Sequence, residues 1–306
     1  MNSSSNGNRF GIQKLEAHDV GNVDEHPLAI VNGVSMMDSQ EMIELDVARL
    51  HSGQLNGPQE ENALRQILVN WVKRNGVGYK QGMHEICLVL YLENDKDVDE
   101  CYKRFDNVMK WLYPLFYRDS GVNEWIKNDF SPMLRKMSPR RLYEIIVVKF
   151  QISHAVWCIR WCRLLFIREL SGPDQYLPIW YELFDIENKG KFIACVTIVM
   201  LMCIVPQLTE AQDESECLYL LLNYPKLCVP IEKVVGWAKI MYDYRAVNTI
   251  DSQHADSDAD ANASPLEEEI LQGSNGEWYK KYKDYDVNRL RMEMRLKRRA
   301  KWRLSK

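Results

Sequence analysis

The sequence has no Cys-x-x-Cys pair and no long uncharged run, although it contains eight cysteines. Most of these cysteines lie within apolar stretches, and the N-terminus is polar with no apolar run behind it. We therefore expect reduced, buried thiols in a cytoplasmic protein, not a disulfide-stabilised secreted domain. The longest uncharged stretch, residues 192–205, has fourteen residues. Because a helix needs about 20 residues to cross the hydrocarbon of a membrane, this stretch predicts a buried helix.

The sequence also lacks the excess of positive charge that nucleic acids require. The 39 Lys and Arg residues are opposed by 43 Asp and Glu residues, a net charge of -4, so we expect no nucleic-acid partner. This balance hides an asymmetry along the chain. Residues 278–306 carry 12 basic and three acidic side chains, a net charge of +9, which leaves -13 for the remaining residues.

Residues 277–306 predict a basic C-terminal helix. Large apolar side chains recur at helical spacing among the basic ones, namely Trp278, Tyr282, Tyr285, Met292 and Leu296. Such a helix fits contact with an anionic membrane or with the acidic remainder of the chain, and the alternative is a solvated basic tail.

Composition divides the rest of the chain into three segments. Residues 1–23 are polar and patternless, which predicts a flexible N-terminus. Residues 24–248 carry the periodic apolar pattern of a packed domain. Residues 249–276 are polar and acidic with little to bury, which predicts a disordered linker.

The apolar spacing of the packed domain is that of helices, and no run of β-branched alternation is present, so the fold class predicted is all-α. Asp38 suits the N-cap of a first helix that begins at Ser39. A second helix begins after Pro58, buries Leu64, Ile67, Leu68 and Trp71, and ends at Gly76 and Gly78. Further helices are expected near 81–92, 100–112, 140–150, 153–170, 177–184, 191–205, 214–222 and 231–245.

Two short motifs have residue types that suit phosphate chemistry. In the first, Asp46 and Arg49 stand at i and i+3 of a helix, so the carboxylate can hold the guanidinium in one direction. In the second, Tyr79, Gln81, Gly82 and Met83 bring a glutamine to a helix N-terminus. Alone, such an arginine is usually a solvated surface residue and such a glutamine a helix cap. Together they supply a charge-neutralising Arg and a water-orienting Gln, which accelerate GTP hydrolysis.

The two motifs resemble the IxxDxxR and YxQGM signatures of the TBC-domain family of Rab GTPase-activating proteins. Later segments are similar to that family as well: residues 159–170 to its RW..LLF.RE helix, residues 179–184 to its LWDxLF stretch, and residues 217–225 to its leucine-rich helix that ends in YP. The resemblance covers residues 24–245. The chain departs from the pattern at Leu50, where Thr is common, and at Tyr181, which replaces the Asp of LWD. The family usually begins with a Trp- and Arg-rich helical stretch, which residues 1–23 do not show. The first helices of the family are therefore either missing or replaced by other segments.

The resemblance implies an all-α TBC-type domain that activates a Rab GTPase and is not itself an enzyme. Arg49 would be an arginine finger and Gln81 a glutamine finger, both inserted in trans, with Asp46 orienting Arg49 and with Tyr79 and Gly82 shaping the glutamine loop. No cofactor belongs to the chain itself, since GTP and Mg²⁺ are bound by the Rab. The protein would act in membrane traffic, in the cytoplasm and peripheral to Golgi or endosomal membranes.

Two other interpretations remain. The chain is a catalytically weak Rab-binding scaffold if the missing opening helices prevent the fingers from being seated, or a membrane-surface adaptor if the basic C-terminal helix dominates. His154, Cys158 and Cys162 recur on one helix face and could ligate a metal, but no fourth ligand follows, so we expect core packing and no metal site.

Overall fold

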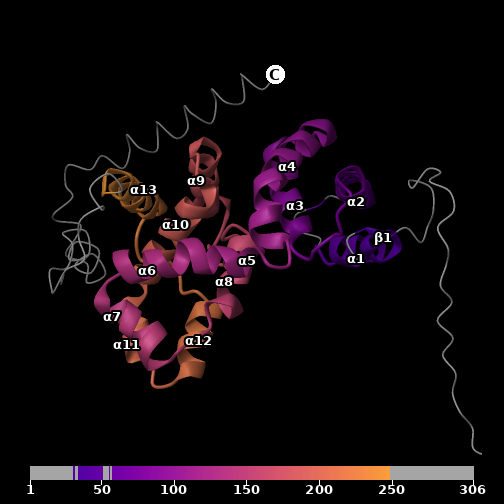
Figure 1. Cartoon of the computed structure of the whole chain (residues 1–306). Helices are drawn as coiled ribbons and strands as arrows, with labels where there is room; N and C mark the ends of the chain where they lie inside the picture. The colour runs from indigo at the N-terminus through magenta and orange to yellow at the C-terminus, as the bar shows by residue number, and fades with distance from the viewer. Residues whose placement is uncertain (1–29, 32–33, 51–54, 56, 249–306) are drawn as a thin grey trace, which may run out of the picture. The chain divides into compact units, whose positions relative to one another are not determined.

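The computed structural model describes residues 30–31, 34–50, 55 and 57–248 (Figure 1). The predicted segments 1–23, 249–276 and 277–306 lie outside these residues. The chain divides into two compact units, residues 1–79 and 80–306, and each is described by itself.

The first unit contains a two-residue antiparallel ladder between β1 (Ile30–Val31) and β2 (Val34–Ser35), followed by α1 (Met36–Ala48) and α2 (Pro58–Asn75). The ladder was not expected, because two residues are too few to show an alternation. The prediction that Asp38 caps the first helix is wrong. Because β2 leads directly into α1, the helix begins at Met36 and Asp38 lies in its first turn, where a carboxylate still favours the helix dipole.

The second helix is confirmed as predicted. Pro58 opens α2, and Gly76 ends it with φ 59°, the left-handed conformation that glycine adopts without strain. The four side chains of the predicted stripe, Leu64, Ile67, Leu68 and Trp71, are all buried. Burying each one contributes about 1.5–3 kcal/mol, so this stripe is a large part of the core of a small unit.

Helices, joined by turns and loops, are the regular secondary structure of the described residues of the second unit, and the all-α fold class is confirmed. Its elements are α3 (Met83–Glu93), α4 (Val98–Leu112), η2 (Tyr113–Tyr117), α5 (Gly121–Trp125), η3 (Ile126–Phe130), α6 (Ser131–Met137), α7 (Arg140–Tyr143), η4 (Glu144–Lys149), α8 (His154–Arg163), α9 (Pro173–Asp185), α10 (Lys189–Cys203), α11 (Val205–Glu210), α12 (Glu214–Leu222) and α13 (Ile231–Asn248). The three η elements are single π-helical turns continuous with neighbouring α-helices.

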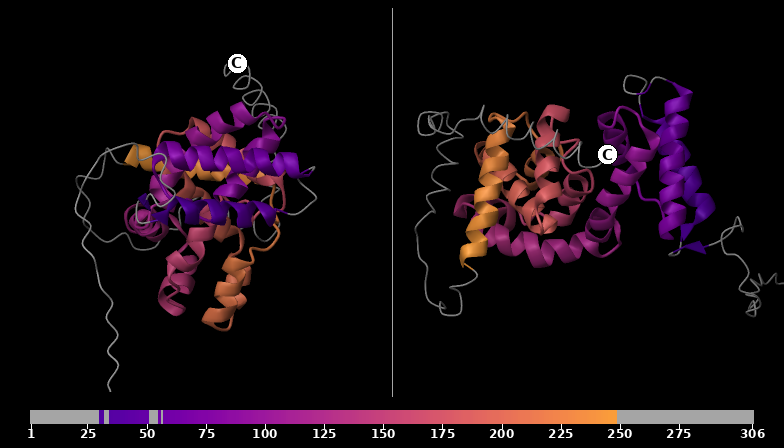
Figure 2. Two further views of the ribbon diagram at one scale, coloured as in Figure 1. Left: turned by 90° about the vertical axis from the view of Figure 1, so that its right-hand side faces the viewer. Right: turned by 90° about the horizontal axis from the view of Figure 1, so that it is seen from above.

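Helix α10 is the centre of this unit. It contacts α13, α6, η3 and α11, so helices cover it on several sides (Figures 1 and 2). Every residue from Phe192 to Met202 is buried, as the uncharged run of the sequence predicts. No helix among the described residues is both long and apolar enough to cross a membrane.

The chain from residue 113 to residue 137 is helical except at residues 118–120, although the sequence did not predict these helices. Pro114 and Pro132 stand within it, and its π-helical turns shift the apolar spacing away from 3.6 residues. Trp125 and Phe130 stack at 5.2 Å, and the Trp125 Nε1 donates to the Gly190 carbonyl at 2.8 Å. Tertiary packing therefore stabilises helices that the local spacing of apolar residues does not predict.

The predicted helix 153–170 is wrong in its second half, because α8 ends at Arg163. Leu165 and Phe166 follow with φ 46° and 67°, in the left-handed region that bulky residues avoid. Two hydrogen bonds hold this turn: the Phe166 N–H donates to the Trp161 carbonyl at 2.9 Å, and the Trp180 Nε1 donates to the Leu165 carbonyl at 2.9 Å.

All eight cysteines lie within the described residues and all are free thiols. Seven are buried and Cys228 is exposed. Burial raises the pKa of the buried thiols at Cys87, Cys158, Cys162 and Cys203, and raises that of Cys217 to about 11. These thiols pack as small apolar side chains.

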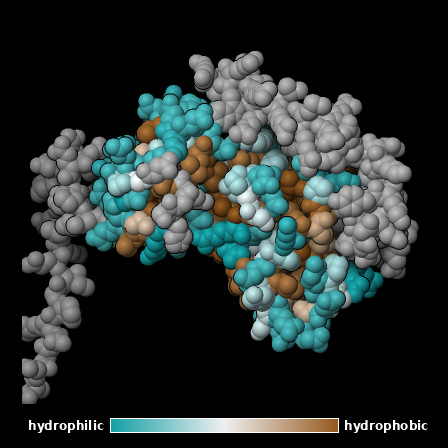
Figure 3. Space-filling model, turned by 180° about the vertical axis from the view of Figure 1, so that it is seen from behind, coloured by the Kyte–Doolittle hydropathy of each residue, from teal (hydrophilic) through white to brown (hydrophobic). Residues whose placement is uncertain are grey.

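The outer surface of the second unit mixes both kinds of side chain. Seen from behind, hydrophobic and hydrophilic residues lie next to one another at the lower end of the molecule, where α11 and α12 lie (Figure 3). Tyr219 of α12 is 65% exposed.

Tyr181 is one of the departures from the family pattern. Its hydroxyl donates a hydrogen bond to Glu93 at 2.9 Å and so joins α9 to the end of α3.

Candidate functional site

Arg49 is the first residue after α1, and its side chain projects into solvent. Its backbone N–H still donates to the Asp46 carbonyl at 3.3 Å, so the last helical turn fixes where the side chain starts. Ile43 and Val47, on the opposite face of α1, are buried and anchor the helix. The Arg49 side chain is 66% exposed, which leaves its guanidinium accessible to a partner.

The Asp46 carboxylate contacts and orients the Arg49 side chain. Its carboxylate is 7% exposed, and its Oδ1 accepts from Arg49 Nη1 at 3.3 Å. Its Oδ2 accepts from the Tyr79 hydroxyl at 2.9 Å. Tyr79 is buried, and its N–H donates to Ser39 Oγ at 3.3 Å. The carboxylate is therefore fixed on one oxygen by a buried phenol and presents the other to the guanidinium.

This geometry differs in one respect from the sequence interpretation, which associated Tyr79 with the glutamine loop. In the structure the Tyr79 hydroxyl binds the residue that contacts Arg49. Asp46, Arg49 and Tyr79 are thus brought together within the first unit. Gln81 and Gly82 belong to the second unit.

Gln81 lies at the entrance of α3, with an exposed side chain. Gly82, the next residue, is buried with φ 102° and forms the N-cap of the helix. A Cβ at this position would lie 2.9 Å from Leu164 Cδ2 and 3.3 Å from the Tyr117 hydroxyl oxygen. Both the backbone conformation and the space therefore require glycine, and the close approach fixes the peptide that carries Gln81.

The residues around this loop reinforce its conformation. The Lys80 carbonyl accepts from the Met83 N–H at 3.3 Å, and the Lys80 N–H lies 3.2 Å from Met83 Sδ. Lys80 Nζ binds Asp119 Oδ1 at 2.8 Å, and this hydrogen bond and its charge lower the pKa of the exposed Asp119 carboxyl. The glutamine loop is thus held on both sides of Gln81.

A small pocket of about 200 Å³ lies beside Gln81, lined by Gln81, Gly82, Glu85, Ile159, Arg160, Arg163, Leu164 and Arg168. Arg168 donates to both oxygens of Glu85, at 3.1 and 2.6 Å. Arg163 Nε donates to the Phe116 carbonyl at 2.7 Å, and burial lowers the pKa of its guanidinium. Each arginine of the pocket has a partner within the unit, and the Arg168–Glu85 pair joins the turn after α8 to α3.

Tyr117 links the same elements. Its hydroxyl donates to the Arg163 carbonyl at 2.9 Å. Burial is the main cause that raises the Tyr117 pKa far above its ordinary value, so the phenol remains a neutral donor. The same hydroxyl limits the space at Gly82.

His154, Cys158 and Cys162 do not form a metal centre in the structure. Among the described residues no group of three or more His, Cys, Asp or Glu side chains is arranged to hold a metal ion. His154 instead packs edge-on against Phe130 at 5.2 Å and Trp157 at 6.1 Å. Burial lowers the His154 pKa.

The sequence alone did not reveal several residues that contact the two motifs, because these contacts join distant parts of the chain. Ser39 is 40 residues from its partner Tyr79, and Arg168 is 83 residues from Glu85. Leu164 approaches Gly82 only because α8 ends in an unusual turn. The sequence did indicate two local features of the site: the i, i+3 spacing of Asp46 and Arg49, and the helix N-terminus that follows Gln81.

Comparison with known proteins identifies the family. The family model described as the Rab-GTPase-TBC domain matches residues 28–209, more than half of the chain and a range that contains both motifs. The chain belongs to this family, as the sequence predicted.

One curated relative and one solved structure show the extent of the likeness. The chain is 30% identical over 177 residues to "TBC1 domain family member 13" of Homo sapiens, an alignment that covers 53% of this chain and 43% of the relative. The chain thus spans less than half the length of that protein. Its fold is similar to the crystal structure of the Ypt/Rab-GAP domain of Gyp1p, with a TM-score of 0.55 and 16% identity, covering 69% of this chain and 74% of that chain.

Proposed function

We propose that this protein is a GTPase-activating protein for a Rab-type small GTPase. Membership of the Rab-GTPase-TBC domain family supports this proposal, and one observation carries it further. Arg49 is 66% exposed and yet directed by a carboxylate that a buried phenol fixes. An exposed cation whose direction is preset is what a finger inserted into another protein's active site requires, because less conformational entropy is lost on docking.

In this proposal each finger has a separate task. Arg49 neutralises the charge that develops on the transferred phosphoryl group, and Asp46 and Tyr79 orient it. Gln81 aligns the attacking water, and Gly82 fixes the peptide that carries it. GTP and Mg²⁺ remain bound to the Rab, so the chain is a regulator that needs no cofactor of its own. Its action in the cytoplasm, on Golgi or endosomal membranes, is part of the same proposal.

The test is single-turnover GTP hydrolysis across a panel of purified Rab proteins. An arginine finger supplied in trans contributes about 10³–10⁵ in rate, so Arg49→Ala should abolish nearly all of the acceleration. Gln81→Ala should lower the rate by about 10² or more if the glutamine positions the water.

Two control variants match these changes in exposure and charge. Arg140 is an exposed arginine of α7 that pairs with Glu144 four residues later. Gln66 is an exposed glutamine of α2. Arg140→Ala and Gln66→Ala should leave hydrolysis within about twofold of the parent protein. Equal losses in the control and finger variants would refute the two-finger assignment. Capture of a GTP-loaded Rab without acceleration would instead identify a binding scaffold.

A further inference from the structure

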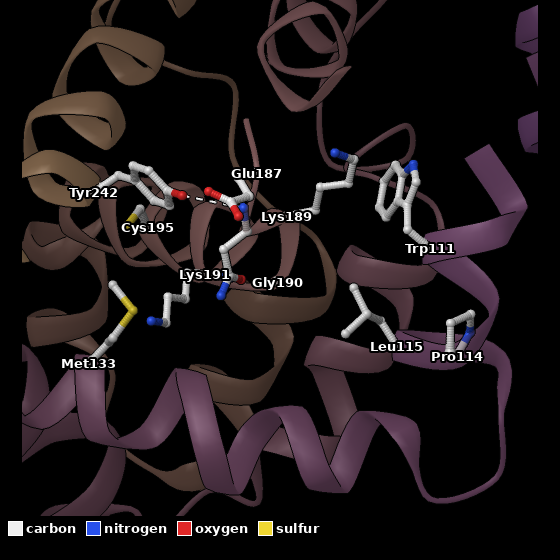
Figure 4. Close-up of a pocket in the computed structure, with 11 residues that line it drawn as sticks. Trp111, Pro114, Leu115, Met133, Glu187, Lys189, Gly190, Lys191, Cys195 and Tyr242 are labelled. Atoms are coloured by element: carbon white, nitrogen blue, oxygen red, sulfur yellow. Dashed lines mark hydrogen bonds between the residues drawn. The ribbon is translucent and has the colours of Figure 1, made fainter. Parts of the chain in front are cut away.

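A groove of about 640 Å³ lies at the N-terminal end of α10. One side is apolar and comes from the end of α4 and from η2, with Trp111, Pro114 and Leu115. Met133 of α6 and Tyr242 of α13 lie across from them, and the start of α10 with Lys189 and Lys191 lies between (Figure 4). The groove therefore combines an apolar lining with two ammonium groups.

The charges at this groove favour an acidic occupant. Lys191 makes no hydrogen bond or ion pair through its side chain with the residues that the structure describes, and Lys189 lies 5.9 Å from the Trp111 ring centre while donating to the Ile186 carbonyl. The amide end of the α10 dipole adds partial positive charge. Glu187 is the single carboxylate among the lining residues.

The chain itself contains a segment with the complementary chemistry. Between Arg245 and Lys280 the sequence has eight Asp or Glu residues and no Lys or Arg. Within it, residues 264–271 read Ser-Pro-Leu-Glu-Glu-Glu-Ile-Leu. Ser264 and Glu267 have the spacing of a capping box with Pro265 at the first helical position, and Leu266 and Ile270 would share one face of such a helix. This pattern is an apolar pair bordered by three carboxylates.

Chain connectivity allows this segment to reach the groove. Tyr242, which lines the groove, stands six residues before the end of α13, about 9 Å along the helix. The 17 residues between Asn248 and Leu266 span about 23 Å on average as a flexible chain, and much more when extended. A tether of this length gives an effective concentration on the order of 1 mM, so weak docking contacts suffice.

We propose that residues 264–271 dock in the groove at the N-terminal end of α10, within the same chain. Leu266 and Ile270 cover the apolar side formed by Trp111, Pro114 and Leu115, and the glutamates at 267–269 lie near Lys189 and Lys191. The docked segment covers the start of α10 and draws the chain after α13 back over the second unit. This proposal does not depend on the activity toward a Rab.

Hydrogen exchange of the full-length chain tests the docking. We assume an intrinsic dissociation constant on the order of 0.1 mM for the docked segment. The effective concentration of about 1 mM is about ten times this value, so the segment is docked about ten times as often as it is free. The amides of residues 266–271 should therefore exchange about tenfold more slowly than those of a free peptide of the same sequence. Replacing both apolar anchors, Leu266→Asp with Ile270→Asp, should remove this protection. Asp256→Lys, a charge change in the same acidic region but outside the segment, should leave it in place.

A charge exchange tests the groove end of the contact. Lys191→Glu should weaken the protection of residues 266–271, and the double variant Lys191→Glu with Glu268→Lys should restore it. Absence of protection in the parent chain, or protection that survives the anchor variant, would overturn the proposal. Protection that grows with protein concentration would also overturn it, because the occupant would then come from a second copy of the chain.

Discussion

At the scale of single residues, the arginine motif depends on a carboxylate that is held from two directions. Asp46 is nearly inaccessible, and its two oxygens bind a buried phenol and an exposed guanidinium. The guanidinium gains direction from this arrangement because the carboxylate itself cannot turn. Tyr79 is therefore as much part of the arginine motif as Asp46.

Tyr79→Phe tests this coupling. Loss of the hydroxyl removes a 2.9 Å hydrogen bond to a carboxylate that is only 7% exposed, which should lower the free energy of unfolding by about 1–3 kcal/mol. Chemical denaturation measures the change. Tyr219→Phe is the control, since Tyr219 is 65% exposed, and it should change the free energy of unfolding by less than about 0.5 kcal/mol. Equal effects of the two changes would show that the Asp46 contact adds no stability.

Gly82→Ala tests the close packing at the glutamine loop. An alanine would adopt φ 102° under strain and its Cβ would press on Leu164 at 2.9 Å. Gly76→Ala is the control for backbone strain, because the exposed Gly76 is also left-handed, with φ 59° and ψ 38°. We expect Gly76→Ala to cost about 1 kcal/mol from backbone strain alone, and Gly82→Ala to cost more. Denaturation midpoints that rank the two the other way would contradict this account.

At the scale of elements, the turn after α8 positions α3. Leu164 closes on Gly82, and Arg168 binds both oxygens of Glu85 one helical turn further along α3. The left-handed Leu165 and Phe166 are what bring Arg168 back toward α3. The backbone strain at these two residues is offset by the contacts that the reversal creates.

A charge exchange between Glu85 and Arg168 isolates this contact. Glu85→Arg alone places two cations together and should lower the rate of stimulated GTP hydrolysis, while the double variant Glu85→Arg with Arg168→Glu should regain most of it. Because Arg168 is 49% exposed, the effect on the free energy of unfolding should be about 1 kcal/mol or less. If the double variant is no better than the single one, the pair does not position α3.

The sequence predicts elements well where burial is periodic and poorly where long-range contacts decide. The apolar stripe of α2 and the uncharged run of α10 could be predicted because each is a single continuous apolar pattern within one helix. The end of α8 was not, since its reversal depends on Trp180, which is 15 residues away from Leu165. The same limit applies to the candidate site, where Asp46 and Arg49 are local but Ser39 and Arg168 are not.

At the scale of the whole molecule, the described core is mostly apolar, with a few polar or ionisable side chains within it or at its edge. His154 is one of them, packed among the rings of Phe130 and Trp157. Its Nδ1 is buried and has no hydrogen-bond partner among the residues that the structure describes. The pKa of His154 lies below its ordinary 6.5 because burial disfavours the charged imidazole.

This depressed pKa predicts how stability depends on pH. Below about pH 6.5 the unfolded chain binds a proton at residue 154 that the folded chain does not, so the free energy of unfolding falls as pH drops from 6.5 to the folded pKa. Above pH 6.5 this contribution is constant. His154→Phe should reduce the loss of stability between pH 7.5 and 5.5, measured by urea denaturation. An unchanged difference between the two pH values would show that residue 154 does not contribute.

The distribution of thiols has a practical consequence for every experiment above. Cys228 is exposed, while the other seven cysteines are buried and, where burial raises their pKa, less able to form the reactive thiolate. A maleimide dye added to the folded native protein should therefore attach at one position without any engineered residue. The chain carries its own attachment point for a fluorophore, so docking of the proposed Rab partner can be tested as a change in anisotropy on the natural sequence.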